Sequence, residues 1–169
     1  DTPVLTVSGA RQVGKTTLVS ELIKNRPARA ANLDDSVTLA AAQGDPDAFV
    51  RQYPLGTLAI DEIQRAPELF RAIKGALEEN RRPGRFIITG SSNLSTLKGA
   101  EESLAGRAET LYLRGFSQGE RLSFVEDFAR FAWSLTNTSS LPEVPHLSRS
   151  EYFTLLTTSA FPEIVNTSR

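Results

Sequence analysis

Short runs of apolar and β-branched residues alternate along the chain with longer amphipathic stretches. The short runs predict five strands, at residues 4–7, 28–33, 57–60, 85–89 and 110–113. The amphipathic stretches, whose apolar positions recur at helical spacing, predict helices at residues 16–24, 37–42, 45–51, 67–79, 117–131 and 148–158. Strand and helix therefore alternate over most of the chain.

Strands of this kind, apolar on both faces and separated by helices, are typical of a parallel sheet that is covered on both sides. We predict an α/β fold, a three-layer sandwich around a central parallel sheet, with right-handed crossovers. Residues 135–150 break the pattern with a polar, proline-containing segment, which we interpret as a linker or long loop. We expect residues 1–134 to form one domain and residues 135–169 to hold a linker and the start of a C-terminal helical segment.

Composition and charge narrow the class of protein. The chain has 169 residues, of which 40% are hydrophobic and 23% charged, as in a soluble globular domain with one core. Its 19 Lys and Arg nearly balance its 20 Asp and Glu, so the net charge of -1 does not favour nucleic acid or an anionic membrane. No apolar run approaches the ~18 residues that span a bilayer.

Two scarce residue types exclude several kinds of site. The chain has no Cys, which excludes disulfides and Cys-ligated metal centres, and this fits a reducing, cytoplasmic location. Its only His, His146, excludes a multi-His metal site and is expected at the surface. The chain also lacks Met and begins just before a strand, so we interpret it as a piece of a longer protein.

A glycine-rich loop follows the first strand. Residues 9–16 match the pattern G-x-x-x-x-G-K-[ST], in which glycines permit unusual backbone angles and successive N–H groups surround phosphate. We expect Lys15 to contact the β- and γ-phosphates and Thr16 to offer its hydroxyl to Mg²⁺. The residues expected to bind the nucleotide are Gly9, Ala10, Arg11, Gln12, Val13, Gly14, Lys15, Thr16 and Thr17.

Two carboxylates follow the third predicted strand. Ligands gather at the carboxyl ends of parallel strands, so Asp61 and Glu62 are expected close to the phosphate loop. Asp61 would hold Mg²⁺ together with Thr16, and Glu62 would act as the general base toward the attacking water. The second carboxylate favours hydrolysis by water over phosphoryl transfer to another substrate.

Hydroxyl and amide groups follow the fourth predicted strand. Thr89 and Ser91, with Asn93 behind them, are candidates for a residue that orients the attacking water between the γ-phosphate and Glu62. A plain strand-to-helix turn, in which Ser92 or Asn93 caps a helix, is the alternative.

Several arginines allow more than one interpretation. Arg107, just before the fifth predicted strand, either reaches a γ-phosphate in its own or a neighbouring subunit or forms a structural salt bridge. Arg81, Arg82 and Arg85 form a basic loop for which we favour a solvated turn over nucleic-acid contact. Trp133 is expected to pack rather than to stack on a base.

Five segments, in this order, resemble a prokaryotic family of AAA-like P-loop ATPases. They lie at residues 9–18, 33–35, 60–69, 89–92 and 102–107. The resemblance implies ATP binding, Mg²⁺ and hydrolysis in a P-loop domain of the additional-strand type, with sheet order 5-1-4-3-2. It also implies a C-terminal domain of unknown function in the same chain. Phe161, Pro162 and Glu163 resemble a family segment that begins with two glycines, which Ser159 and Ala160 replace here.

These patterns favour an Mg²⁺-dependent ATPase domain that drives or switches an attached C-terminal domain. The alternatives are a nucleotide-dependent binding switch with little turnover and a small-molecule P-loop kinase, which the Asp61–Glu62 pair disfavours. A GTPase is disfavoured because the chain has no N-K-x-D motif. ATP is the expected partner; a homo-oligomer and nucleic acid are left open, and no membrane partner is expected.

Overall fold

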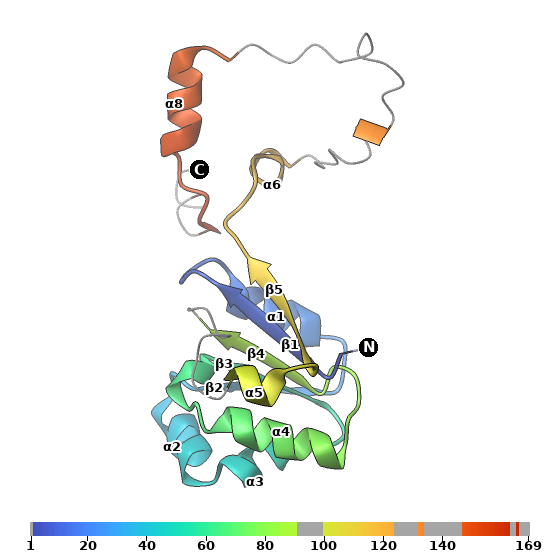
Figure 1. The fold of residues 1–169 in the computed structure, drawn as a ribbon. Coiled ribbons are helices and arrows are strands. Elements are labelled where there is room, and N and C mark those ends of the chain that lie inside the picture. Colours follow the sequence, from blue (N-terminus) through green and yellow to red (C-terminus); the bar gives the residue numbers. More distant parts are fainter. Residues whose placement is uncertain (1, 91–99, 124–131, 134–146, 163–164, 166–169) are drawn as a thin grey trace. The chain divides into compact units, whose positions relative to one another are not determined.

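Five parallel strands form one sheet in the structure, a computed structural model that describes residues 2–90, 100–123, 132–133, 147–162 and 165 (Figure 1). The strands are β1 (Val4–Gly9), β2 (Ala28–Asn32), β3 (Thr57–Asp61), β4 (Phe86–Gly90) and β5 (Ala108–Leu113). Their order is β2-β3-β4-β1-β5, and each neighbouring pair is parallel. This is the predicted order read from the opposite edge, so the prediction of the sheet is confirmed.

The helices connect the strands much as the amphipathic stretches predict. They are α1 (Lys15–Ile23), α2 (Ser36–Gly44), α3 (Pro46–Arg51), the 3-10 helix η1 (Ile63–Arg65), α4 (Leu69–Glu79), α5 (Ala100–Leu104), α6 (Gln118–Leu122) and α8 (Arg149–Thr157). Helix α5 was not predicted, because five residues hold too few apolar positions to show a period. The helix expected at residues 117–131 begins as α6, and residues 124–131 lie outside the described part of the chain.

Helices cover both faces of the sheet and form the outer layers of the sandwich (Figure 1). On one face, Val19 of α1 packs with Val7, Ala59 and Ile87. On the other face lies the larger core, to which α2, α3, α4 and α5 contribute. Its largest side chains are Phe70, Phe86, Leu33, Leu58, Ile60, Ile63, Leu69, Ile73, Leu77, Ile88 and Val4. The predicted three-layer architecture is confirmed.

The strands differ in burial according to their place in the sheet. Strands β3 and β4, in the interior, are buried almost throughout, whereas β2 and β5, at the edges, are largely exposed. Leu111 and Tyr112 of β5 are 43% and 59% exposed. The expectation of strands that are apolar and buried on both faces is therefore wrong for the two edges, where a strand has only one neighbour.

The chain divides into two compact units, residues 1–114 and 115–169. The second unit holds α6 and α8, and each begins with a capping box, Ser117 with Glu120 and Ser148 with Glu151. The domain boundary expected after residue 134 stays a prediction, because residues 134–146 lie outside the described residues. Within the described part of the chain, no helix combines the length and the apolar character needed to cross a membrane.

Candidate functional site

Two glycines shape the loop between β1 and α1. Gly14 has φ 99° and ψ 18°, in the left-handed region, and precedes the first residue of α1. At Gly9 the constraint is a close approach, since a Cβ atom would lie 2.4 Å from the carbonyl oxygen of Leu113 in β5. The expected unusual backbone angle is thus found at Gly14, whereas Gly9 lets β5 pass next to the start of the loop.

The first turn of α1 is well suited to bind an anion. The cap residue, Gly14, has no side chain, so the N–H groups that begin the helix receive no side-chain hydrogen bond from it. Lys15 is only 5% exposed, and its Nζ donates hydrogen bonds to the carbonyl oxygens of Gly9 at 3.1 Å and Ala10 at 2.8 Å. The ammonium group is therefore held against the loop, where a phosphate group can accept its hydrogen bonds.

Asp61 joins the ends of two strands to the start of α1. Its Oδ2 accepts a hydrogen bond from the Thr16 hydroxyl at 2.7 Å, and its Oδ1 accepts one from the Thr89 hydroxyl. These residues come from the end of β3, the start of α1 and β4. The structure therefore brings together the phosphate loop and the two polar strand ends, as expected for the carboxyl edge of a parallel sheet.

Glu62 directly follows β3 and adopts an unusual backbone conformation. Its φ is 58° and its ψ is 46°, a left-handed geometry that is uncommon for a residue with a side chain. Its N–H donates to the Thr89 hydroxyl at 3.2 Å, and its carboxylate Oε2 accepts a hydrogen bond from the Gln64 side-chain amide. The Thr89 hydroxyl thus links the Asp61 carboxylate to the Glu62 backbone at the start of the turn.

Thr89 organises this cluster from the interior. It is 1% exposed, donates to Asp61 and accepts from the Glu62 N–H. The structure thus assigns its hydroxyl to the two carboxylate-bearing residues. The other candidates after β4, Ser91 and Asn93, lie outside the described residues, as does Ser92.

Arg107 is not brought to the phosphate loop. It precedes β5, and its carbonyl accepts from the N–H of Val4, at the start of β1. The phosphate loop follows the other end of β1, about 20 Å away for a six-residue strand. The Arg107 Nη1 donates only to the nearby carbonyl of Ala105, at 3.3 Å, among the described residues. An arginine side chain cannot span this distance, so the Arg107 side chain does not reach the phosphate loop of its own domain.

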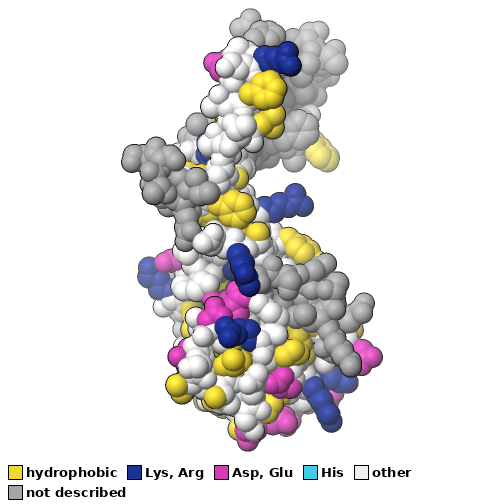
Figure 2. All heavy atoms as spheres, turned by 90° about the vertical axis from the view of Figure 1, so that its left-hand side faces the viewer, with side chains coloured by type: hydrophobic (Ala, Val, Ile, Leu, Met, Phe, Trp, Pro, Cys, Tyr) yellow, Lys and Arg dark blue, Asp and Glu magenta, His cyan; other side chains and the backbone are white. Residues whose placement is uncertain are grey.

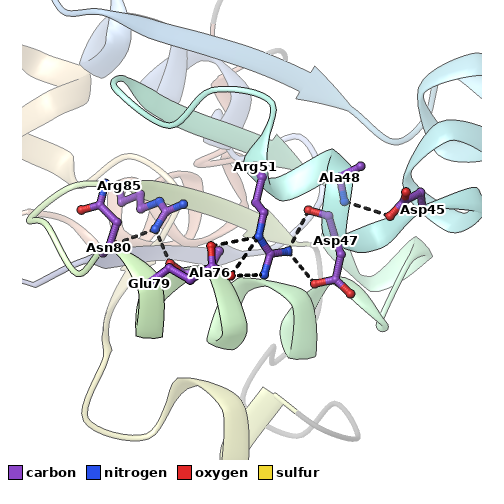
Figure 3. Close-up of polar contacts among 8 residues, drawn as sticks. All are labelled: Asp45, Asp47, Ala48, Arg51, Ala76, Glu79, Asn80 and Arg85. Atoms are coloured by element: carbon purple, nitrogen blue, oxygen red, sulfur yellow. Dashed lines mark hydrogen bonds and ion pairs between the residues drawn. The ribbon is translucent and has the colours of Figure 1, made fainter.

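The basic loop before β4 is structural. The guanidinium groups of Arg81, Arg82 and Arg85 donate to the carbonyl oxygens of Gly106 (2.9 Å), Gly56, and both Ala76 and Asn80 (2.6 Å for Asn80). Figure 3 shows Arg85 with its two carbonyl partners at the C-terminal end of α4. Arg85 is 3% exposed, and this burial, together with the charge of Arg82, lowers its pKa. The expected solvated turn is therefore wrong for Arg85.

The remaining single residues give no further site. Trp133 is 89% exposed, so its expected packing is wrong within the described part of the chain, and His146 lies outside that part. On the face drawn in Figure 2, the described Lys and Arg side chains lie among Asp and Glu side chains rather than in one basic patch. No group of three or more His, Cys, Asp or Glu able to hold a metal occurs among the described residues.

One residue of the site had no assigned role in the sequence-based interpretation. Gln64 lies two residues after Glu62, and the structure joins their side chains directly. The D-E-x-Q spacing was the available signal, but only the 3-10 turn of η1 brings residues two apart into contact.

A family model described as an AAA domain matches residues 1–122 of the chain. Two uncharacterised proteins, Mb2031c of Mycobacterium bovis and Rv2008c of Mycobacterium tuberculosis, are each 36% identical to it over 115 residues. That stretch is 68% of this chain and 26% of each relative, so the chain spans about a quarter of the length of the curated relatives it matches.

One solved structure of low sequence identity has a similar fold. A signal transduction ATPase with numerous domains and a tetratricopeptide repeat sensor, PH0952 from Pyrococcus horikoshii, is 14% identical with a TM-score of 0.52. The match covers 98% of this chain and 27% of that one. The Walker-type ATPase PABY2304 of Pyrococcus abyssi is also 14% identical, with a TM-score of 0.47 over 73% of this chain and 52% of that chain.

Proposed function

The chain belongs to the family of AAA domains, and we propose that it binds ATP with Mg²⁺ and hydrolyses it, with Glu62 as general base. One observation carries this proposal. Thr16, Asp61, Thr89 and Glu62 form one connected cluster beside the phosphate loop. A carboxylate that contacts the phosphate-loop hydroxyl, followed by a second carboxylate, is an arrangement suited to metal-assisted hydrolysis of a phosphoanhydride.

The oxygen atoms near the loop fit Mg²⁺. This ion usually takes one or two protein carboxylates and completes its coordination with phosphate oxygens and water. The Thr16 hydroxyl and the Asp61 carboxylate, 2.7 Å apart, offer such a partial set, and ATP would supply the phosphate oxygens. When bound, the ion would neutralise charge on the β- and γ-phosphates.

The chain's own residues have separate roles in binding the phosphates and in hydrolysis. The Lys15 ammonium and the N–H groups of the loop hold the phosphates, for which Lys15 would exchange its present carbonyl partners. Glu62 accepts a proton from a water molecule whose oxygen attacks the γ-phosphorus, and the bond to the β-phosphate oxygen breaks to release ADP. Thr89 keeps Asp61 and the Glu62 backbone in place.

Replacement of Glu62 tests the assignment of the base. Glu62→Gln keeps the shape of the side chain and removes its basicity, so we expect ATP to bind as in the wild type. Turnover should fall by about 10²–10⁴-fold. Glu68→Gln is the matched control, because Glu68 is an exposed carboxylate close in sequence that caps no N–H group. Wild-type turnover in Glu62→Gln would show that another residue is the base.

Replacement of Asp61 tests the assignment of the metal ligand. Asp61→Asn should weaken Mg²⁺-dependent ATP binding by roughly tenfold or more, because a charged interaction of about 1.5 kcal/mol is lost. Binding measured in EDTA should differ little between this variant and the wild type. An equal loss with and without Mg²⁺ would contradict the metal role.

A second candidate function is a nucleotide-dependent switch with little turnover. The position of Arg107 favours it, because the domain does not supply this cation to its own γ-phosphate. If a neighbouring copy receives Arg107, turnover per subunit rises with protein concentration, and mixing Arg107→Ala with Glu62→Gln subunits restores activity. Flat rates and no restoration favour the switch. For both candidate functions, we propose that an attached C-terminal domain responds to the nucleotide, either to its hydrolysis or to its binding.

A further inference from the structure

We propose that Gln64 is a positioning residue for Glu62, a role that rests on the proposed function of Glu62 as the base. The Gln64 Nε2 donates a hydrogen bond to the Glu62 Oε2. A glutamate side chain otherwise has several rotamers, and only some place an oxygen where it can take a proton from the attacking water. The Gln64 amide selects one of them and leaves the other carboxylate oxygen, Oε1, for that proton.

The backbone that carries Gln64 is held in a tight turn. The carbonyl of Glu62 accepts from the N–H of Arg65 at 3.1 Å, and the carbonyl of Ile63 accepts from the N–H of Ala66 at 3.0 Å. Ile63 and Ala66 on either side of the turn are fully buried in the core. These contacts bring two residues that are only two positions apart in the chain into side-chain contact.

Contacts from other elements hold the same turn in place. Arg65 forms an ion pair with Asp34, in the loop after β2, and its carbonyl accepts from the Gln43 side chain of α2 at 3.3 Å. The donor to Glu62 is therefore attached to a turn anchored by the core, by α2 and by the loop after β2. A donor on so constrained a segment can orient a carboxylate, because the segment loses little freedom in doing so.

Glutamine is the side chain that suits this task. Its amide donates a hydrogen bond and carries no charge, so it orients the carboxylate without forming a salt bridge. Methionine has a similar length and no N–H donor. Gln64→Met therefore removes the hydrogen bond and keeps most of the volume.

The experiment compares Gln64→Met with Gln43→Met. Gln43 also contacts this turn, through the carbonyl of Arg65, but does not touch Glu62. Single-turnover hydrolysis, with protein in excess over labelled ATP, gives the rate, and calorimetry gives the dissociation constant for ATP. We expect Gln64→Met to lower the rate by about tenfold to a hundredfold with an unchanged dissociation constant. Gln43→Met removes one of several contacts on the turn and keeps the hydrogen bond to Glu62, so it should lower the rate much less.

A spectroscopic readout tests the contact without turnover. The side-chain NH₂ signals of Gln64, identified by their loss in Gln64→Met, should shift in Glu62→Ala and stay in place in Glu68→Gln. Unshifted signals in Glu62→Ala would overturn the proposal. So would a Gln64→Met rate within twofold of the wild type or above it, or an equal loss in Gln43→Met.

Failure of this inference differs from failure of the proposed function. If Gln64 has no positioning role, Gln64→Met hydrolyses ATP normally while Glu62→Gln remains inactive. If Glu62 is not the base, Glu62→Gln itself hydrolyses ATP at the wild-type rate, and the positioning role falls with it.

Discussion

The parallel strands begin at the amino edge of the sheet and end at its carboxyl edge. Polar side chains have opposite kinds of partner at these two places. At the carboxyl edge, side chains bond to one another: Thr16 and Thr89 to Asp61, and Gln64 to Glu62. At the amino edge, the guanidinium groups of the basic loop bond to backbone carbonyls. Most polar side chains of the candidate site therefore bond to other side chains, whereas the structural arginines bond to backbone carbonyls.

The direction of the helices explains this difference. In an α/β fold the helices begin at the carboxyl edge, where unpaired N–H groups attract anions, and end at the amino edge, where unpaired carbonyls attract cations. Helix α1 begins beside the phosphate loop, and α4 ends next to Arg85. Lys15 differs from the other side chains at the carboxyl edge, because it bonds to backbone carbonyls of the loop before α1. We propose that it exchanges these carbonyls for phosphate when ATP binds.

The largest expected effect at the carboxyl edge comes from Lys15→Ala. Two charge-assisted hydrogen bonds to phosphate, together worth about 3 kcal/mol or more, would be lost. ATP binding measured by calorimetry should weaken by about 100-fold or more. The unfolding midpoint without nucleotide should stay close to that of the wild type. An unchanged dissociation constant would refute the phosphate assignment.

The largest expected effect at the amino edge comes from Arg85→Leu. Leucine retains apolar volume but removes the Arg85 donor from the Asn80 carbonyl, and it leaves the Ala76 carbonyl with the N–H of Asn80 alone. The free energy of unfolding in urea should fall by about 3 kcal/mol. ATP affinity of the folded protein should be unchanged, and a selective loss of ATP affinity would break the contrast between the two edges.

The smallest expected effect concerns Arg51, which joins α3 to α4 (Figure 3). Its Nε and Nη2 donate to Glu79 at 3.0 and 2.7 Å, and its Nη1 donates to Asp47 at 2.6 Å. The hydrogen bonds from Arg51 lower the pKa of Glu79 below its usual value of 4.5. The stabilisation by this pair is therefore present above pH 4.5 and is lost as the pH falls through the lowered pKa.

Thermal unfolding of Arg51→Ala, measured over a range of pH, tests whether this stabilisation is lost in acid. The variant should unfold at a slightly lower temperature than the wild type at pH 7, and the two should converge in acid. Arg71→Ala, which removes an exposed arginine from α4, the helix that holds Glu79, should show no such pH dependence. A gap that widens in acid would contradict the assigned direction.

Local sequence determined the parts of this protein that depend on neighbouring residues. The period of apolar positions indicated most strands and helices, and the phosphate loop and the Asp61–Glu62 pair followed from motifs only a few residues long. The strand order followed from resemblance to a family. The meeting of Thr16 with Asp61 followed from the rule that parallel strands end at one edge.

Only the tertiary structure decided what Arg85, Arg107 and Gly9 do. Arg107 and Arg85 both lie just before a strand, but Arg85 meets the carbonyls at the end of α4, whereas Arg107 meets the carbonyl of Ala105. Gly9 is constrained by Leu113, more than 100 residues away. Glu62 meets Gln64 because a buried 3-10 turn forms between them. The first two features arise from contacts between distant segments, and the third depends on a local turn that contacts with other elements hold in place.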